Sequence, residues 1–353
     1  MTSRSLWISA ALIFALVPVA LGASEEKGAW RDLASAPIET DFNYRTSVWT
    51  GKEMLVFGRK QQTALDRNGN RYATSRSDVA AAYEPRSNTW RRLEPLRGST
   101  GFMGLASAWT GKEMIVWGEG TREAFNPRTN VWRRLPESRL LSVHDGFGAV
   151  VWTGRELIGW GGGCCGDAFS DGVAYRPATN TWRALARAPL PGAQRPLAAW
   201  TGREMVVVAG AKAAAYDPAK NVWRRLPRVP ARRGAAAVWD GREVLVVGET
   251  RNGFAYSPAG NTWRRLPAVP AGRAGSVAVW AGHRLYLLGG RRGGAAYEPA
   301  TNRWATLPRA PLPAGLDPTA VWTGRSLLVW GGVPTKVWGK YASAGAAFAP
   351  VRP

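Results

Sequence analysis

The sequence predicts an all-β protein, a seven-bladed β-propeller with four-stranded blades. Two observations carry this prediction. Three short motifs recur along the 353 residues, and self-similarity at a period of roughly 40 to 50 residues indicates a repeat architecture. Each repeat also contains turn signals that divide it into four short strands.

Each repeat contains the same three motifs in the same order. The first is a Trp before a tight turn, the second is an aromatic-x-Pro, and the third is a Trp seven residues after that aromatic. The first motif occurs at Trp49, Trp109, Trp152, Trp200, Trp239, Trp280 and Trp322. The aromatic of the second motif is Tyr83, Phe125, Tyr175, Tyr216, Tyr256, Tyr297 or Phe348. The third motif occurs at Trp90, Trp132, Trp182, Trp223, Trp263 and Trp304, with a displaced copy at Trp30.

Blade five illustrates how one repeat is expected to fold. Its strands are predicted over Gly234 to Trp239, Val244 to Val247, Phe254 to Tyr256 and Thr262 to Leu266, with turn residues between them. The first strand is rich in small side chains, which suits the crowded axis of a ring. The second is continuously apolar, which is typical of a strand buried on both faces. Units of four antiparallel strands form propeller blades.

The third motif is absent from the last repeat and present before the first, as Trp30-Arg31-Asp32-Leu33. We expect this segment to be the outermost strand of the blade that begins at Trp322. The pairing joins the two ends of the chain, so it closes the ring and protects an open sheet edge. Truncation of Gly28 to Leu33 is therefore expected to open the ring.

The first 23 residues differ from the repeats that follow. A short polar start with Arg4, an apolar run from Leu6 to Leu21 and small residues after it predict a secretory signal peptide over residues 1–23. An uncleaved N-terminal anchor is the alternative. The propeller then spans residues 24–353 and is exported, to the periplasm, the cell wall or the medium. We expect a monomer without membrane contact beyond the signal peptide.

The only two cysteines are adjacent, Cys164-Cys165, in a glycine-rich segment. In an oxidising compartment they are expected to form a vicinal disulfide that shapes a loop, with free thiols as the alternative. Adjacent cysteines without a nearby His are poor ligands for one tetrahedral metal ion. No metal site is predicted.

An apolar strand that ends in Gly-Gly, followed by a Tyr and then by a Trp seven residues on, resembles the kelch repeat. The doublet is present at Gly161-Gly162, Gly289-Gly290 and Gly331-Gly332 and is degenerate in the other repeats. The resemblance, to bacterial exported kelch proteins and galactose-oxidase-like propellers, covers almost all of the chain after the signal peptide. It implies a propeller fold but little about chemistry, because kelch propellers include enzymes, sugar-binding proteins and interaction modules.

Galactose oxidase is an enzyme to which this resemblance points, and it implies a copper ion held by two His and two Tyr, with one Tyr cross-linked to a Cys. The chain contains two histidines, His144 and His283, which are expected on opposite faces of the ring, and it has no lone Cys. Copper-radical oxidase chemistry is therefore not expected, and no cofactor is predicted.

The two faces of the predicted ring differ in their loops. The turns after the first-motif Trp residues share one face, the tight-turn face, where loops are short and uniform. Loops after the second strand of each blade and loops between blades share the other, the variable-loop face. Binding residues commonly lie on variable loops of a rigid scaffold. Long loops are predicted over Arg59 to Val79, Gly163 to Gly172 and Val333 to Ala344.

Blades one and seven are neighbours in a closed ring, so their long loops are expected to form one wall. Basic and aromatic side chains are interleaved there, and together they can hold an anionic or sugar-like ligand by charge and stacking. Two solvated surface loops are the alternative. The predicted binding residues are Arg59, Lys60, Arg71, Tyr72, Lys336, Trp338, Lys340 and Tyr341, with Arg195, Arg233 and Arg273 from loops between blades.

The formal net charge of +22 suggests a polyanionic partner. Much of this charge belongs to the repeats, in the Arg-Arg pairs after the third-motif Trp and in the tight turns. We interpret those residues as a solvated rim that protects the sheet edges. Export and the even distribution of charge around the ring argue against nucleic acid as a partner.

The sequence favours a scaffold that binds a protein or an acidic carbohydrate through the variable-loop face. The alternative is an enzyme acting on an anionic carbohydrate, which resemblance to the periplasmic kelch mutarotases of sialic acid implies. Such an enzyme needs a carboxylate acid or base near cationic groups. The candidates for this carboxylate, chosen because they are expected on the variable-loop face, are Glu119, Glu123, Asp145, Asp167, Glu249 and Asp317. No catalytic residue is assigned.

Overall fold

The structure is a computed structural model, and it describes residues 24–40, 45–65, 67–68, 71–96, 105–118, 121–138, 140, 148–163, 166–230, 234–248, 250–312, 315–316, 318–331, 333–334 and 343–351. The predicted signal peptide and the Cys164-Cys165 pair lie outside these residues. The regular elements are β-strands. Within the described ranges, no helix is long and apolar enough to cross a membrane.

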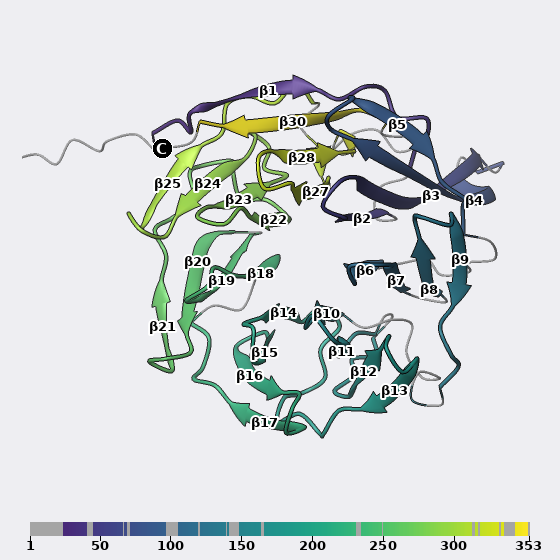
Figure 1. Ribbon diagram of the computed structural model, residues 1–353. Helices are drawn as coiled ribbons and strands as arrows, with labels where there is room; N and C mark the ends of the chain where they lie inside the picture. The colour runs from purple at the N-terminus through teal and green to yellow at the C-terminus, as the bar shows by residue number, and fades with distance from the viewer. Residues whose placement is uncertain are drawn as a thin grey trace, which may run out of the picture.

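Seven four-stranded antiparallel sheets form a ring of blades around a central axis (Figure 1). Blade one contains β2 (Arg45–Trp49), β3 (Met54–Leu65), β4 (Arg71–Glu84) and β5 (Thr89–Arg92). Blade two contains β6 (Ala106–Trp109), β7 (Met114–Gly118), β8 (Thr121–Asn126) and β9 (Val131–Arg134). Blade three contains β10 (Ala149–Trp152), β11 (Leu157–Trp160), β12 (Gly172–Arg176) and β13 (Thr181–Ala184). The predicted fold class is confirmed.

The remaining blades follow the same order from the axis outward. Blade four contains β14 (Leu197–Trp200), β15 (Met205–Ala209), β16 (Lys212–Asp217) and β17 (Val222–Arg225). Blade five contains β18 (Ala236–Trp239), β19 (Val244–Gly248), β20 (Thr250–Ser257) and β21 (Thr262–Arg265). Blade six contains β22 (Val277–Trp280), β23 (Leu285–Leu288), β24 (Ala295–Glu298) and β25 (Arg303–Thr306). Blade seven contains β27 (Thr319–Trp322), β28 (Leu327–Trp330), β30 (Gly345–Pro350) and β1 (Gly28–Asp32).

The core lies between neighbouring blades rather than at the axis. Each of seven hydrophobic clusters combines one blade with the next. Between blades four and five, for example, Val206 and Val208 of β15 pack with Val244 and Tyr256 of the next blade. The apolar runs of the second strands are buried, as in all five residues of β15. The inter-blade packing gives the loops of both faces a rigid base.

The ring closes as predicted. Strand β1 pairs with β30 in antiparallel register, which places Trp30 opposite Phe348, and their rings lie 5.1 Å apart. The indole N–H of Trp30 donates to the carbonyl of Pro308 in the loop after blade six, at 3.0 Å. The two ends of the chain therefore meet in one sheet, at the top of the ring in Figure 1.

The residues before β1 also bind blade six, which the sequence did not predict. The amide of Thr306 donates to the carbonyl of Ser24, and the amide of Glu26 donates to the carbonyl of Thr306, both at 2.8 Å. Glu26 is buried and forms an ion pair with Arg284. We call residues 24–27 the N-terminal clasp, because they tie the closing strand to the neighbouring blade.

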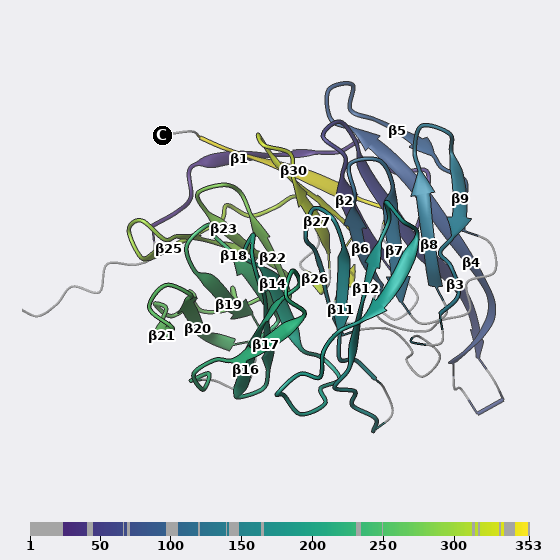
Figure 2. The same ribbon diagram turned by 60° about the horizontal axis from the view of Figure 1, so that its bottom comes forward.

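The expectation of a long loop over Arg59 to Val79 is wrong, because β3 and β4 continue their pairing almost to the tip, as far as Leu65 opposite Arg71. A bulge between Gln62 and Thr63 shifts the register on the way. The hairpin extends beyond the ring at blade one (Figures 1 and 2). No glycine, proline, asparagine or aspartate occurs from Arg59 to Leu65, so nothing in this stretch ends β3.

Candidate functional site

The base of the blade-one hairpin already neutralises two of the predicted binding residues. The guanidinium of Arg59 donates to Asp78 at 2.8 Å, and both side chains are buried, 6% and 5% exposed. The ammonium of Lys60 lies 2.7 Å from Glu39. Because β3 faces β4 in this register, Arg59 opposes Asp78 directly. The Arg59 pair therefore stabilises the start of the hairpin extension.

The structure locates the other predicted binding residues only in part. Arg71 and Tyr72 lie on β4, opposite Leu65 and Ala64, but their side chains are not described. Arg195 is exposed in the loop before β14. Outside the described residues lie Arg233, Lys336, Trp338, Lys340 and Tyr341. The shared wall of the blade-one and blade-seven loops, and the predicted vicinal disulfide, stay predictions.

Arg273 lies in a pocket of about 480 Å³ on the variable-loop face, between blades six and seven. Within the described part of its wall there are four arginines and no acidic residue. The arginines are Arg273, Arg291, Arg292 and Arg309. Leucine, proline and valine side chains and the ring of Trp30 supply apolar surface beside them. We call this cavity the basic pocket.

The basic pocket depends on a tight glycine turn between β23 and β24. The amide of Gly293 donates to the carbonyl of Gly290 at 2.9 Å, which closes the turn. A Cβ on Gly290 would lie 2.6 Å from the Gly293 carbonyl oxygen and 2.7 Å from the Arg273 Cα, so only glycine fits there. The turn leaves Arg291 and Arg292 at its exposed tip.

The four arginines of the basic pocket differ in how they are held. Arg273 donates from Nη1 to the carbonyls of Gly294, at 2.9 Å, and Leu307, at 2.7 Å. Burial, with the nearby charge of Arg292, lowers the pKa of Arg273, although Glu25 opposes this. Arg309 is exposed, and no acidic residue within the described ranges pairs with its guanidinium. Guanidinium groups of this kind form bidentate bonds with carboxylate, sulfate or phosphate groups.

Sequence reasoning found Arg273 but missed the other three arginines of the basic pocket. The run Arg291-Arg292-Gly293-Gly294 is the hairpin connection between β23 and β24. A departure from the repeat sequence could have identified these three arginines. A basic pair stands in a glycine turn on the variable-loop face, and Arg309 precedes the next inner strand on that same face.

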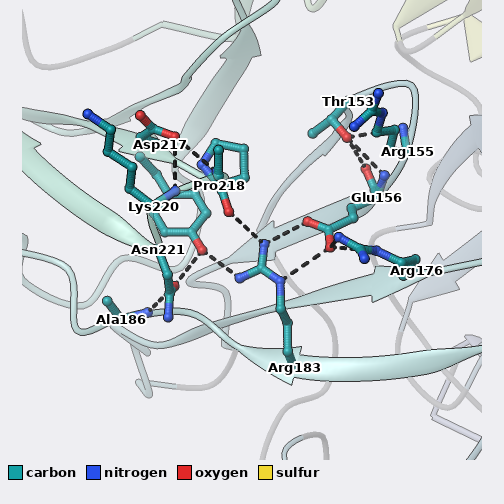
Figure 3. A network of polar contacts seen from close by, with 12 residues as sticks. Thr153, Arg155, Glu156, Arg176, Arg183, Ala186, Asp217, Pro218, Lys220 and Asn221 are labelled. Atoms are coloured by element: carbon teal, nitrogen blue, oxygen red, sulfur yellow. Dashed lines mark hydrogen bonds and ion pairs between the residues drawn. The ribbon is translucent and has the colours of Figure 1, made fainter. Parts of the chain in front are cut away.

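On the tight-turn face of blades one to five, the first Arg after the third-motif Trp forms an ion pair, which the interpretation of these arginines as a solvated rim did not include. Figure 3 shows the network around Arg183 of β13. Its guanidinium lies 2.6 Å from Glu156, in the tight turn of its own blade. Nη1 also donates to the hydroxyl of Tyr216 in the next blade, at 2.7 Å, and that hydroxyl donates to Asn221 at 2.6 Å. The arrangement connects two blades through one guanidinium.

The same ion pair recurs in blades one to five, with N···O distances between 2.6 and 2.9 Å. Burial raises the pKa of Glu156, but the hydrogen bonds and charges of Arg183 and Arg176 outweigh burial and hold this pKa below its ordinary value. The five pairs are Glu53–Arg91, Glu113–Arg133, Glu156–Arg183, Glu204–Arg224 and Glu243–Arg264. The second arginines of the motif and the cations at the tips of the tight turns are exposed, as predicted.

Of the candidate carboxylates, the two whose positions are described do not line the basic pocket. Glu123 lies in β8 of blade two, which is separated from blade seven by blade one (Figure 1). Burial raises its pKa, and Arg134 only partly opposes this. Asp167 is exposed in the blade-three loop. Four candidates lie outside the described residues: Glu119, Asp145, Glu249 and Asp317.

The residues described here do not provide a copper site of the oxidase type. Within those ranges, no group of three or more His, Cys, Asp or Glu side chains could hold a metal ion. His283 is exposed at a tight turn of blade six, on the face opposite the basic pocket. His144 lies outside the described residues.

No family model and no curated protein matches this chain. Among solved structures, it is similar to a fungal alcohol oxidase of the AA5 family in complex with copper. That comparison has a TM-score of 0.66 at 13% identity and covers 92% of this chain and 76% of the oxidase chain. A chain of the mitotic checkpoint complex aligns with a TM-score of 0.60 at 13% identity over 100% of both chains. At such identities the likeness shows the fold alone.

The fold and the solved-structure comparison show a seven-bladed β-propeller that is similar in fold to the AA5 alcohol oxidase. The oxidase activity and the copper ion are properties of the fungal enzyme. Function in this chain therefore has to be argued from its own residues.

Proposed function

We propose that the protein is an exported binding scaffold whose variable-loop face holds an anionic group of a protein or carbohydrate ligand. The observation that carries this proposal is the basic pocket. It brings four arginines together beside apolar surface, and the described part of its wall contains no acidic residue to neutralise them. A concave site with a few convergent charged groups is the usual form of a ligand site.

The pocket suits a ligand with an anionic head and an apolar body. Arg273 is fixed by two backbone carbonyls, so it provides a positive charge of constant position. Arg291 and Arg309 are exposed at the rim and can reach toward a ligand. The apolar surface of Leu288 and Leu312 lies in the same wall and would accept the ligand body.

A salt titration tests the proposal. Binding of poly-L-glutamate, which stands in for an acidic protein segment, is measured by calorimetry at several salt concentrations for the protein and for Arg291→Gln with Arg309→Gln. Each exposed ion contact contributes about 0.2–1 kcal/mol, so we expect roughly twofold to thirtyfold weaker binding for the double variant and a smaller salt dependence. The matched control is Arg225→Gln, an exposed charge on β17 of blade four. Equal loss in the control would show nonspecific charge attraction and overturn the proposal.

The catalytic alternative has its own test. The described wall of the basic pocket contains no carboxylate, which favours binding over turnover. Asp317 precedes Pro318 of that wall and lies outside the described residues. Anomer exchange of sialic acid, measured by NMR and abolished in Asp317→Asn, would establish the enzyme instead. Export is tested separately, by mass spectrometry of the N-terminus of the mature protein.

A further inference from the structure

The repeated tryptophans fall into two classes according to their indole N–H groups. The outer residues, on the fourth strands, donate to a carbonyl of the preceding blade, as Trp182 does to Pro136 at 2.9 Å and Trp223 does to Ala186 at 2.8 Å. The inner residues at the ends of the first strands are half-buried. For Trp152 and Trp239 no acceptor of this N–H is found within the described part of the chain. The indole N–H groups of these two tryptophans are therefore available to a ligand.

Trp152 and Trp239 each form part of the wall of a pocket on the tight-turn face. The pocket between blades two and three has a volume of about 910 Å³ and is lined by Lys112, Glu113, Arg133, Trp152, Arg155 and Pro177, among others. The pocket between blades four and five has a volume of about 580 Å³ and is lined by Arg203, Glu204, Lys220, Arg224, Trp239 and Pro258, among others. The same motif positions build both, so they are equivalent sites.

The walls of these inter-blade pockets offer donors and acceptors side by side. In the first, Arg133 and Glu113 form an ion pair at 2.7 Å, and in the second Arg224 and Glu204 do so at the same distance. A guanidinium beside a carboxylate can serve two adjacent hydroxyl groups, one as acceptor and one as donor. A half-buried indole next to them offers a flat apolar face with one N–H donor. Adjacent hydroxyls around a ring with an apolar face are the chemistry of a sugar.

The charges at the rims of the two pockets indicate which kind of sugar they favour. At the rim of the first pocket Lys112 and Arg155 are exposed, and at the rim of the second so are Arg203 and Lys220. Within the described ranges, none of these four side chains forms an ion pair. Each pocket thus combines a neutral ion pair with two exposed cations, and in the second pocket Asp217 adds a carboxylate that accepts from the backbone amides of Ala219 and Lys220. Cations outnumber carboxylates in both walls, which favours a sugar that carries a carboxylate.

We propose that the inter-blade pockets of the tight-turn face bind uronic-acid units of a polysaccharide, with more than one pocket occupied by the same chain. This goes beyond the proposed function, because it uses the opposite face of the ring. Two equivalent pockets on one rigid ring convert the second contact into an intramolecular one. A polymer then binds about 10²–10⁴-fold more tightly than its single sugar, without any new kind of contact.

The test compares polygalacturonate, galacturonic acid and neutral dextran as probes, with calorimetry as the readout. Polymer binding at least tenfold tighter than monomer binding, and no binding of dextran, are expected. Trp152→Phe combined with Trp239→Phe keeps the aromatic ring and the inter-blade packing but removes both N–H donors. We expect the polymer to bind about threefold to tenfold more weakly for each hydrogen bond lost.

A second variant keeps the proposal falsifiable if the tryptophan variant folds poorly. Arg155→Gln with Arg203→Gln changes only exposed turn residues and is expected to weaken polymer binding and its salt dependence. Arg225→Gln and, on the other face, Arg309→Gln are the matched controls and are expected to leave it unchanged, so this proposal and the proposed function fail separately. Unchanged binding in both pocket variants, equal binding of monomer and polymer, or binding only to vesicles of phosphatidylglycerol would each overturn the proposal.

Discussion

Removal of the Trp30 side chain is the sharpest test of how the ring is held closed. Trp30 lies on β1, at the centre of its pairing with β30. Its ring packs on Phe348 at 5.1 Å, and its N–H donates to Pro308 at 3.0 Å. The substitution Trp30→Ala removes both contacts while the backbone pairing stays available. We expect the closing strand to detach before the rest of the ring unfolds.

The expected loss follows from these contacts. Truncation of a buried Trp to Ala costs about 3–5 kcal/mol, and the half-burial of Trp30 places it near the lower end. Within that total, the hydrogen bond contributes about 1 kcal/mol and the ring pair about 1 kcal/mol. Closing a flexible loop of about 300 residues costs at most about 5 kcal/mol of chain entropy. The loss of about 3 kcal/mol of contact energy is comparable with this entropy cost, so the Trp30→Ala variant should populate an open ring.

Trp223→Ala in blade four is the matched control. It loses an equivalent hydrogen bond, to Ala186 at 2.8 Å, and an equivalent ring contact, with Tyr216 at 4.9 Å. Urea unfolding should show similar destabilisation of both variants, but Trp30→Ala alone should expose residues 24–33 to protease before the main transition. Equal protease resistance at the N-terminus of both variants would refute the reasoning, as would a soluble, cooperatively unfolding protein that lacks Gly28 to Leu33.

Two further predictions concern the inter-blade network. Hydrogen bonds from Arg133, together with the charges of Arg133 and Lys112, hold the pKa of Glu113 below its ordinary value of 4.5, although burial raises this pKa. The Glu113–Arg133 pair therefore stabilises the fold above pH 4.5, and this stabilisation is lost as the pH falls through the pKa of Glu113 in the folded protein. Urea midpoints should therefore decline below about pH 4.5, and less steeply in Glu113→Gln; an equal decline would contradict this. Asn221 has a φ of 55°, and its Oδ1 accepts from Tyr216 and from the Ala186 amide. Asn221→Ala should destabilise the protein by about 1 kcal/mol more than Asn221→Gly, because both lose the bonds but only alanine strains this backbone; equal urea midpoints would show that the backbone is not strained.

The fold could be predicted from the sequence because every blade repeats the same signals at the same spacing. Blade five shows the limit of boundary prediction: β20 begins at Thr250 rather than at Phe254, since the β19–β20 pairing continues past a bulge. The ring closure was predictable from one displaced motif. The hairpin extension was not predictable, because charged residues such as Arg59 and Asp78 are also typical of loops. Only the register of β3 and β4 shows that these two residues face each other.

The Glu–Arg ion pairs of the tight-turn face were harder to predict, because each joins residues about 20 to 40 positions apart in one blade, but the sequence does contain a signal. Blades one to five keep both the Glu of the tight turn and the Arg after the third-motif Trp. In blade six both change together, to Arg284 and Ala305. The structure supplies the reason: Glu26 of the N-terminal clasp replaces the missing carboxylate and pairs with Arg284. Two changes in the same repeat thus predict a contact with a segment outside the repeats.

The ion pairs also decide which part of the net charge of +22 is available to a ligand. Arginines such as Arg183 are balanced within the fold, by Glu156 in that case, and their guanidinium groups are committed to holding two blades together. Among the described residues, the cations that stay exposed include the tips of the tight turns, the second arginines of the third motif and, on the other face, the basic pocket. A regular ring of charge and a single local cluster impose different demands on a ligand. The first suits a repeating polymer that meets equivalent pockets, and the second suits one anionic group held at one place, so the two faces should select different partners.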